Sequence, residues 1–336
     1  MERVAVILNP NARRNRRRGT RGDELREIVR GWGQVRETQT LEELGPALRE
    51  LLDGGAEYVV ADGGDGCLHW VVNETRAVVG AGALPTFVPT NGGTIDFVAR
   101  KSRVSGTVET ILTRLVRHLQ ERRPPPAFPL DTLEVTGVAR AADGALQPFR
   151  RLGFALAAGG VGQRFFEKYY SEPILGAPAI VRIVARATAS HLATRLPVRP
   201  PAEWTRFGEE IFKPTRARVV IDGRAVDCEA HGAIHAGAFD VQLGGLFHVF
   251  PLAREEGRLH FQAGALEPLE VIRALPALVR GGAIPGERFL EVSGAEMIVE
   301  AVDEPLAPVM DGETLRAVVR LEVRRGPRIR IPRIEA

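Results

Sequence analysis

Residues 58–68 read YVVADGGDGCL and carry the clearest structural signal in the chain. Tyr58–Ala61 is a short apolar run typical of a buried strand, and an apolar helical pattern begins near Leu68. The sequence between them, Asp62-Gly63-Gly64-Asp65-Gly66, is therefore predicted to be a strand-to-helix turn. Glycines in such a turn let the backbone approach a phosphate closely, and the following helix N-terminus offers free amide groups. The alternative is an ordinary tight turn, because Asp-Gly pairs are common in turns.

The first third of the chain alternates predicted strands and helices around this turn. The predicted elements are Val4–Leu8, Leu41–Leu52, Tyr58–Ala61, a helix from Leu68, Pro85–Pro89 and a helix ending near Gln120. This alternation predicts an α/β domain with a parallel sheet covered on both faces. In open parallel sheets, ligands bind beyond the carboxyl ends of the strands.

The prolines in Glu121–Pro129 cannot continue the preceding helix, so we expect the first domain to span 1–123. Short apolar segments follow, at Leu130–Thr136, Arg150–Ala158, Arg218–Ile221, Gly232–Gly237, Leu259–Gln262, Phe289–Val292 and Met297–Val302. They predict a β-rich, sandwich-like domain over 130–310, interrupted by one helix at Pro178–Leu196. We expect residues 311–336 to form a C-terminal segment that returns to the first domain.

Two further polar turns follow predicted strands of the first domain. Asn9–Ala12 follows the first strand, and Asn91–Thr94 follows the strand at Pro85–Pro89. Thr94 could donate to a phosphate, and Asp96 could either cap the next helix or bridge to the first turn. The arginines of Arg13–Arg18 could face phosphates or anionic lipid headgroups, although a charge run is more often a solvated surface.

In order and spacing, these three turns resemble the nucleotide-binding motifs of the diacylglycerol kinase catalytic family, which includes bacterial lipid kinases, sphingosine kinases and ceramide kinases. Met310-Asp311-Gly312-Glu313 is similar to the family's C-terminal Asp-Gly-Glu motif. The resemblance implies a nucleotide domain like that of NAD kinase and phosphofructokinase, joined to a β-rich domain that helps to hold a lipid.

The resemblance also implies site residues. The catalytic base would be Asp311 or Glu313, with Asp65 as the rival. The expected nucleotide contacts are Asn9, Pro10, Asn11, Ala12, Arg13, Thr38, Thr40, Gly63, Gly64, Asp65, Gly66, Cys67, Leu68, His69, Trp70, Gly93 and Thr94. ATP and Mg²⁺ are the implied cofactors, and no metal ligands are assigned.

Three positions depart from the family pattern. Cys67 replaces the usual Thr, Trp70 the usual Glu, and Asp96 the usual Asn. These changes affect positions expected to bind ribose and phosphate, so a nucleotide-binding protein with weakened activity is an alternative.

The composition and the spacing of residues argue against several other classes of protein. No run of about 18 apolar residues predicts a membrane span, and the N-terminus lacks a signal-peptide pattern. Cys67 and Cys228 do not form a disulfide framework, and the histidines lack metal-ligand spacing. The net charge of +3 suits an anionic ligand or a membrane surface but decides little. We expect a cytoplasmic protein, peripheral at the inner membrane face, without a nucleic-acid partner; the oligomeric state is left open.

The sequence thus favours an ATP-dependent phosphotransferase with an alcohol acceptor on a lipid. Diacylglycerol, ceramide and sphingoid bases are the candidate acceptors, so the lipid class could be a phospholipid precursor or a sphingolipid. The alternatives are an NAD kinase-like enzyme and a catalytically weak, nucleotide-binding membrane regulator.

Overall fold

The computed structural model describes residues 3–10, 12, 21–197 and 200–334. The chain divides into two compact units. The first comprises residues 1–130 together with 328–336, and the second comprises 131–327. The last residues of the chain thus belong to the first unit, whereas 311–327, including Asp311 and Glu313, belong to the second.

The first unit is built on one six-stranded sheet with the strand order β2-β1-β3-β4-β21-β5. Its strands are β1 (Val4–Leu8), β2 (Gly33–Glu37), β3 (Tyr58–Asp62), β4 (Thr86–Pro89), β5 (Ala127–Leu130) and β21 (Ile329–Pro332). The pairs among β1 to β4 are parallel, β21 is parallel to β4, and β5 is antiparallel to β21. Every residue of β1, β3 and β4 is buried, as expected for a sheet covered on both faces.

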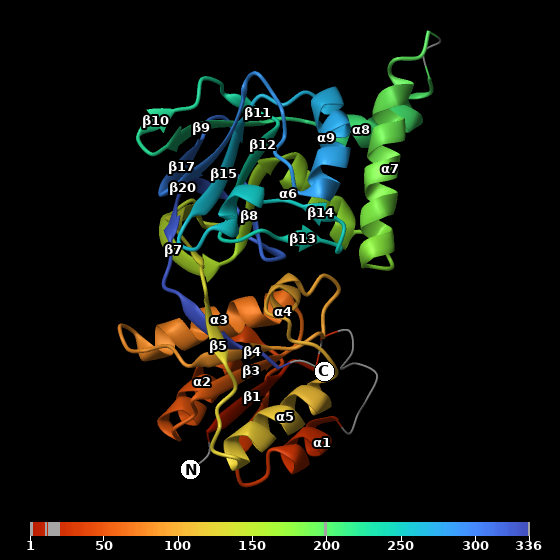
Figure 1. The fold of residues 1–336 in the computed structure, drawn as a ribbon. Coiled ribbons are helices and arrows are strands. Elements are labelled where there is room, and N and C mark those ends of the chain that lie inside the picture. Colours follow the sequence, from red (N-terminus) through yellow and green to blue (C-terminus); the bar gives the residue numbers. More distant parts are fainter. Residues whose placement is uncertain (1–2, 11, 13–20, 198–199, 335–336) are drawn as a thin grey trace. The chain divides into compact units, whose positions relative to one another are not determined.

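The helices of the first unit are α1 (Arg21–Ile28), α2 (Leu41–Asp53), α3 (Asp65–Val79), α4 (Phe97–Lys101) and α5 (Val108–Gln120). Figure 1 shows them packed around the sheet. The buried residues of α5 recur at helical spacing from Val108 to Leu119, which fixes the face turned to the core. Thr107 begins this helix, and its hydroxyl accepts a hydrogen bond from the Thr110 amide at 3.3 Å.

The second unit contains two large antiparallel sheets and a two-stranded one, formed by β13 (Gln242–Leu243) and β14 (Phe247–His248). One large sheet has the order β10-β9-β17-β20-β6-β7 with β11 paired to β9, and the other has the order β16-β15-β12-β8-β18-β19. The strands of the first sheet are β6 (Leu133–Arg140), β7 (Leu146–Gly153), β9 (Thr215–Ile221), β10 (Arg224–Ala225), β11 (Ala230–His231), β17 (Glu296–Ala301) and β20 (Val318–Arg325). Those of the second are β8 (Ala155–Gly160), β12 (Ala233–Gly237), β15 (Leu259–Gly264), β16 (Phe289–Gly294), β18 (Val309–Met310) and β19 (Glu313–Thr314). The α/β first domain and the β-rich second domain of the sequence prediction are both confirmed.

Several elements of the second unit differ from the sequence prediction. The expected strand Arg150–Ala158 is two strands, β7 and β8, which belong to different sheets and meet at Phe154. The expected single helix is α7 (Ala177–Ala193), but three more helices of the unit escaped prediction: α6 (Val161–Tyr170), α8 (Ala202–Ile211) and α9 (Pro268–Arg280). These helices are 10 to 13 residues long and do carry apolar residues at helical spacing, a signal that the sequence prediction did not use.

None of the described helices is both long and apolar enough to cross a membrane. Cys67 and Cys228 are free thiols, as the sequence predicted.

Candidate active site

Three turns that are distant in sequence are joined at one edge of the first unit's sheet. They follow β1, β3 and β4. The amide of Asn9 donates to the carbonyl of Asp62 at 3.3 Å, and the amide of Gly92 donates to the carbonyl of Gly63 at 3.1 Å. These bonds link the first turn to the second and the second to the third. The arrangement agrees with the expectation that the carboxyl ends of neighbouring parallel strands carry one site.

Glycine is required where the second and third turns touch. A Cβ atom on Gly64 would lie 2.7 Å from the Cα of Gly93, and one on Gly92 would lie 2.8 Å from the carbonyl oxygen of Gly63. Both distances are below van der Waals contact, and both neighbours are backbone atoms that cannot swing aside. The glycines of the two motifs therefore allow two main chains to pack directly against each other.

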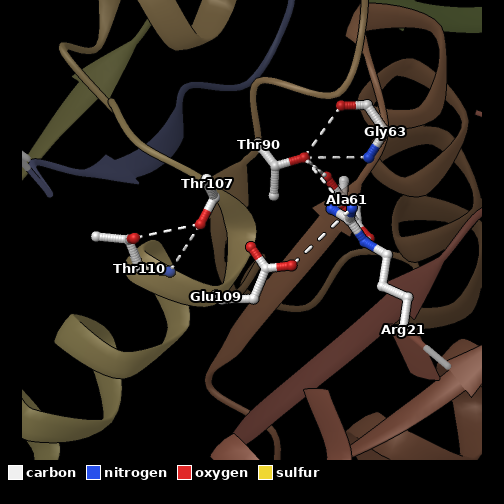
Figure 2. Close-up of polar contacts among 8 residues, drawn as sticks. Arg21, Ala61, Gly63, Thr90, Thr107, Glu109 and Thr110 are labelled. Carbon is white, nitrogen blue, oxygen red and sulfur yellow. Dashed lines mark hydrogen bonds and ion pairs between the residues drawn. The ribbon is translucent and has the colours of Figure 1, made fainter. Parts of the chain in front are cut away.

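Thr90, at the end of β4, holds the turn after β3 with its hydroxyl group. The oxygen accepts a hydrogen bond from the Gly63 amide at 3.1 Å. It also lies 3.2 Å from the Ala61 carbonyl and 3.1 Å from the Gly63 carbonyl, either of which can accept its proton. Figure 2 shows the hydroxyl at the centre of these contacts. The sequence analysis missed Thr90, although a hydroxyl directly after a buried strand is a usable signal.

Asp62, the first residue of the glycine motif, forms a buried ion pair. Its two carboxylate oxygens accept hydrogen bonds from Nε and Nη2 of Arg21 at 3.1 and 3.2 Å, and the Asp62 side chain has no exposed surface. Burial raises the pKa of Asp62, while the guanidinium of Arg21 and the hydroxyl of Thr90 oppose that rise. Glu109 on α5 lies 4.0 Å from the same guanidinium (Figure 2). The group therefore anchors α1 and α5 to the end of β3.

Asp65 caps a helix that follows a different turn. One carboxylate oxygen accepts from the Phe97 amide at 3.1 Å, and the other accepts from the Val98 amide at 3.3 Å. These are amides of the first turn of α4, which lack partners within the helix. Asp96 was expected to cap this helix or to bridge to the glycine turn at 62–66. It is the residue before α4 but makes no side-chain capping bond; its backbone is left-handed, with φ of 52°, and its Oδ1 accepts from the Gly93 amide at 2.9 Å.

The remaining predicted nucleotide contacts occupy different environments. Gly66, Cys67, Leu68, His69 and Trp70 all lie in α3; Leu68 and His69 are buried, whereas Cys67 and Trp70 are partly exposed. Thr38 is buried beyond β2, where its amide donates to the Leu8 carbonyl at 3.1 Å, and Thr40 precedes α2. Pro10, Ala12 and Thr94 are partly exposed. Asn11 and Arg13 lie outside the described residues.

Of the predicted acidic pair of the second unit, Asp311 lies on the turn between β18 and β19, and Glu313 is the first residue of β19. Asp311 has φ of 51°, and its side chain is buried. Oδ1 of Asp311 accepts from the amides of Phe154 and Ala155 at 3.0 and 2.9 Å, at the corner between β7 and β8. Glu313 is half-buried, and its carboxylate makes no hydrogen bond or ion pair with the residues that the structure describes. The two acids therefore differ: one is tied to the backbone, and the other is available to a ligand.

No group of three or more His, Cys, Asp or Glu side chains suited to a metal ion occurs among the described residues. Mg²⁺ in nucleotide sites is commonly held by the substrate phosphates with one or two carboxylates and water. Such a site does not need a three-residue cluster, so the carboxylates of the described residues are compatible with a magnesium ion that arrives with the nucleotide.

Residues 3–123 match the sequence profile of the diacylglycerol kinase catalytic domain. The first unit of the chain is therefore similar to the catalytic domain of the family that its motifs indicated. No curated protein matches the chain in sequence.

Solved structures share the fold of both units. A Bacillus anthracis protein assigned as a diacylglycerol kinase aligns with a TM-score of 0.65 at 15% identity, covering 98% of this chain and 96% of that one. A second structure with this assignment, also from Bacillus anthracis, aligns with a TM-score of 0.56 at 14% identity, covering 98% and 96%. Yeast NADH kinase, solved with NADH, aligns with a TM-score of 0.52 at 8% identity, covering 98% and 83%. By fold, the chain is thus similar to these kinases.

Proposed function

We propose that the chain is an ATP-dependent lipid kinase that transfers the γ-phosphate to a hydroxyl of diacylglycerol, ceramide or a sphingoid base. The observation that supports this most directly is the joined set of turns after β1, β3 and β4, whose glycines let two backbones meet at the N-terminus of α3. A helix N-terminus of this kind favours phosphate through its free amides and its dipole.

Phosphoryl transfer mainly requires that the acceptor oxygen be aligned with the γ-phosphate and that the charge of the transition state be neutralised. We assign phosphate binding to the turn 63–66 and to Thr94, and ribose or base contacts to the exposed edge of α3 at Cys67 and Trp70. When bound, Mg²⁺ would supply charge neutralisation at the phosphates. The rigid support for this surface comes from Thr90, Asp65 and the Arg21–Asp62 pair.

Among the three candidate carboxylates, we assign the acceptor proton to Glu313. Asp65 and Asp311 each accept main-chain amide hydrogen bonds, which fit a role in holding turns. Glu313 makes no such bond with the described residues and follows the turn that Asp311 fixes. A general base must be able to reach a substrate proton, and Glu313 is the acid left available for this.

The base assignment is tested with Glu313→Gln beside Asp311→Asn. Glu313→Gln should lower kcat by roughly 10²–10⁴-fold while leaving nucleotide affinity nearly unchanged. Asp311→Asn should chiefly lower the free energy of unfolding, because buried amides lose a charged acceptor. If Glu313→Gln turned over at the wild-type rate, the assignment to Glu313 would be wrong, and activity loss in a stably folded Asp311→Asn would move the role to Asp311.

The activity itself is tested with purified protein, γ-labelled ATP, Mg²⁺ and a panel of diacylglycerol, monoacylglycerol, ceramide and sphingosine. Label is expected in one of these lipids. NAD is included as an acceptor because of the fold shared with yeast NADH kinase. Label in NAD alone would support the NAD kinase-like alternative. Nucleotide binding without transfer to any acceptor would support a regulator, for which Cys67 and Trp70 are the motivating substitutions.

A lipid acceptor implies that the protein works at a membrane surface from the cytoplasm. We therefore propose peripheral attachment to the membrane, made without a membrane-spanning helix among those described.

A further inference from the structure

The helix α7 exposes an apolar stripe that nothing in the described structure covers. Val181 is 48% exposed and Leu192 is 47% exposed. They lie eleven residues apart, about three helical turns, so both side chains project from the same side of α7. Ala185 and Ala189 lie between them and are also exposed.

The opposite side of α7 is apolar as well. Ala179, Ile180, Ile183 and Ala187 are buried there. Contact with α8 is fixed at Ser190, whose hydroxyl donates to the Thr205 carbonyl at 3.0 Å and accepts from the Gly208 amide at 2.7 Å. A helix that is apolar on two sides normally has both sides buried, yet here one side faces outward. Figure 1 shows α7 beside α8 at the margin of its unit.

The segment around α7 is also purely basic in sequence. Residues 173–202 contain four arginines, Arg182, Arg186, Arg195 and Arg199, and no aspartate, glutamate or lysine. Within the described residues, Arg186 lies over the Phe207 ring at 4.2 Å, and Arg182 pairs with Glu172 at 2.6 Å. Ile174, before α7, is 61% exposed, and Trp204, on the neighbouring α8, is 62% exposed.

This combination of apolar surface and positive charge matches one kind of partner. Two copies of α7 would place like charges opposite each other, because residues 173–202 carry arginines and no carboxylate, and the neighbouring Glu172 is already paired with Arg182. This disfavours self-association through this face. An anionic bilayer instead offers negative headgroups to the arginines and hydrocarbon to the apolar stripe.

We propose that the exposed face of α7, defined by Val181, Ala185, Ala189 and Leu192 with its flanking arginines, is the surface through which this protein docks on anionic lipid membranes. The helix lies in the interface and does not cross the bilayer. The docking proposal rests on the proposed lipid kinase activity. Docking itself requires neither nucleotide nor turnover, so membrane docking and kinase activity can be tested separately.

Docking is tested by co-sedimentation of the full chain with vesicles of phosphatidylcholine containing phosphatidylglycerol, without ATP. Val181→Ser/Leu192→Ser should weaken binding at least about tenfold, because two apolar side chains no longer enter the interface. The matched control is Leu146→Ser on β7, which removes an equally exposed leucine (58%) from another face and should bind like wild type. Binding of the wild type should fall in pure phosphatidylcholine vesicles and in high salt.

Both substituted positions are exposed, so thermal unfolding of the double variant should match wild type. Equal vesicle binding by wild type and Val181→Ser/Leu192→Ser would overturn the proposal. So would a wild-type dimer in solution that the double variant dissociates, because the face would then be a subunit contact. Kinase activity on lipid in detergent micelles should be unchanged in the double variant. If neither the wild type nor any variant phosphorylated a lipid, the proposed function would be wrong. The vesicle-binding measurements would still test the docking face of α7.

Discussion

At the scale of single residues, the candidate site depends on side chains that hold turns in place. Thr90 is the clearest case, since one hydroxyl satisfies the Gly63 amide and lies within bonding distance of two carbonyls. Asp62 and Asp65 are both part of the glycine motif, yet both are engaged with other parts of the first unit. The aspartates of the motif therefore hold the turn in place, and its glycines allow the close main-chain contact.

Thr90→Val should lower the free energy of unfolding by about 0.5–1.5 kcal/mol, because the hydroxyl's hydrogen bonds are lost while side-chain volume is kept and the Gly63 amide retains the Ala61 carbonyl at 3.0 Å. Urea unfolding measures this. Thr113→Val, at an exposed position of α5 where the hydroxyl donates to the Glu109 carbonyl at 2.7 Å, is the control and should change stability little. Thr90→Ser should restore most of the loss, and a stable Thr90→Val protein would show that the hydroxyl is dispensable.

Asp62→Asn should be more damaging, by about 3–5 kcal/mol, because it leaves the buried Arg21 guanidinium with the more distant Glu109 carboxylate, at 4.0 Å, as its counter-charge. Glu57→Gln gives the matched comparison. Glu57 pairs with Arg3 at the surface, where its side chain is 51% exposed, so its loss should cost no more than about 1 kcal/mol. Similar unfolding curves for the two variants would contradict the structural role given to the buried pair.

At the scale of elements, the turn after β3 and the turn after β4 contact each other through their main chains, and this contact leaves no room for a side chain. Gly64→Ala should lower stability by about 1–3 kcal/mol and weaken nucleotide binding, because the new methyl group meets the Gly93 Cα. Gly45→Ala in α2 is the same chemical change in a helix interior, where the nearest atom is the mobile end of Glu74, 3.3 Å away. It should leave nucleotide binding unchanged and raise stability by about 0.5–1 kcal/mol. Isothermal titration with ATP and urea unfolding distinguish the two outcomes.

The strands β12, β15 and β16 carry a buried polar network that the proposed chemistry does not use. Nδ1 of His235 lies 2.9 Å from Oε1 of Gln262, whose amide nitrogen donates to Glu291 at 2.9 Å. His260 lies 3.0 Å from the same glutamate oxygen. Burial lowers the pKa of His235 from 6.5 to about 4, because the charged imidazolium would be poorly solvated there.

This network predicts a pH dependence of stability. The unfolded chain takes up a proton on His235 near pH 6.5, whereas the folded chain does so only near pH 4. The contribution of His235 to the free energy of unfolding is therefore fully present above about pH 6.5. It is lost as the pH falls toward 4, and the loss amounts to up to about 3 kcal/mol. His235→Gln should flatten urea-unfolding free energies across this window, and His118→Gln in the first unit should not. An unaltered pH profile in His235→Gln would exclude the histidine as its source.

At the scale of the whole molecule, the sequence predicted the elements that have strong local signals and missed those that depend on distant partners. The strands β1 and β3 and the turn at Gly63 were predicted because the signal for each lies in a few consecutive residues. The corner at Phe154 and the strand β21 were not, because a basic alternating segment such as Arg328–Arg333 becomes a core strand only by pairing with β4 and β5. Likewise, no local pattern shows that Asp65 caps α4 or that Asp311 binds the amides at Phe154.

The placement of β21 predicts how the chain responds to truncation. Ile329, Ile331 and Ile334 are buried in the first unit, between strands formed some 200 residues earlier. Deleting 328–336 removes this strand and several kcal/mol of apolar burial, which is comparable to the total stability of a domain. The first unit should then unfold and lose nucleotide binding. The second unit, a continuous segment from 131 to 327, should keep its β-sheet circular dichroism and resist limited proteolysis. Deleting only 335–336 is the control, and ATP binding by the longer truncation at wild-type affinity would show that β21 is not needed for the fold of the first unit.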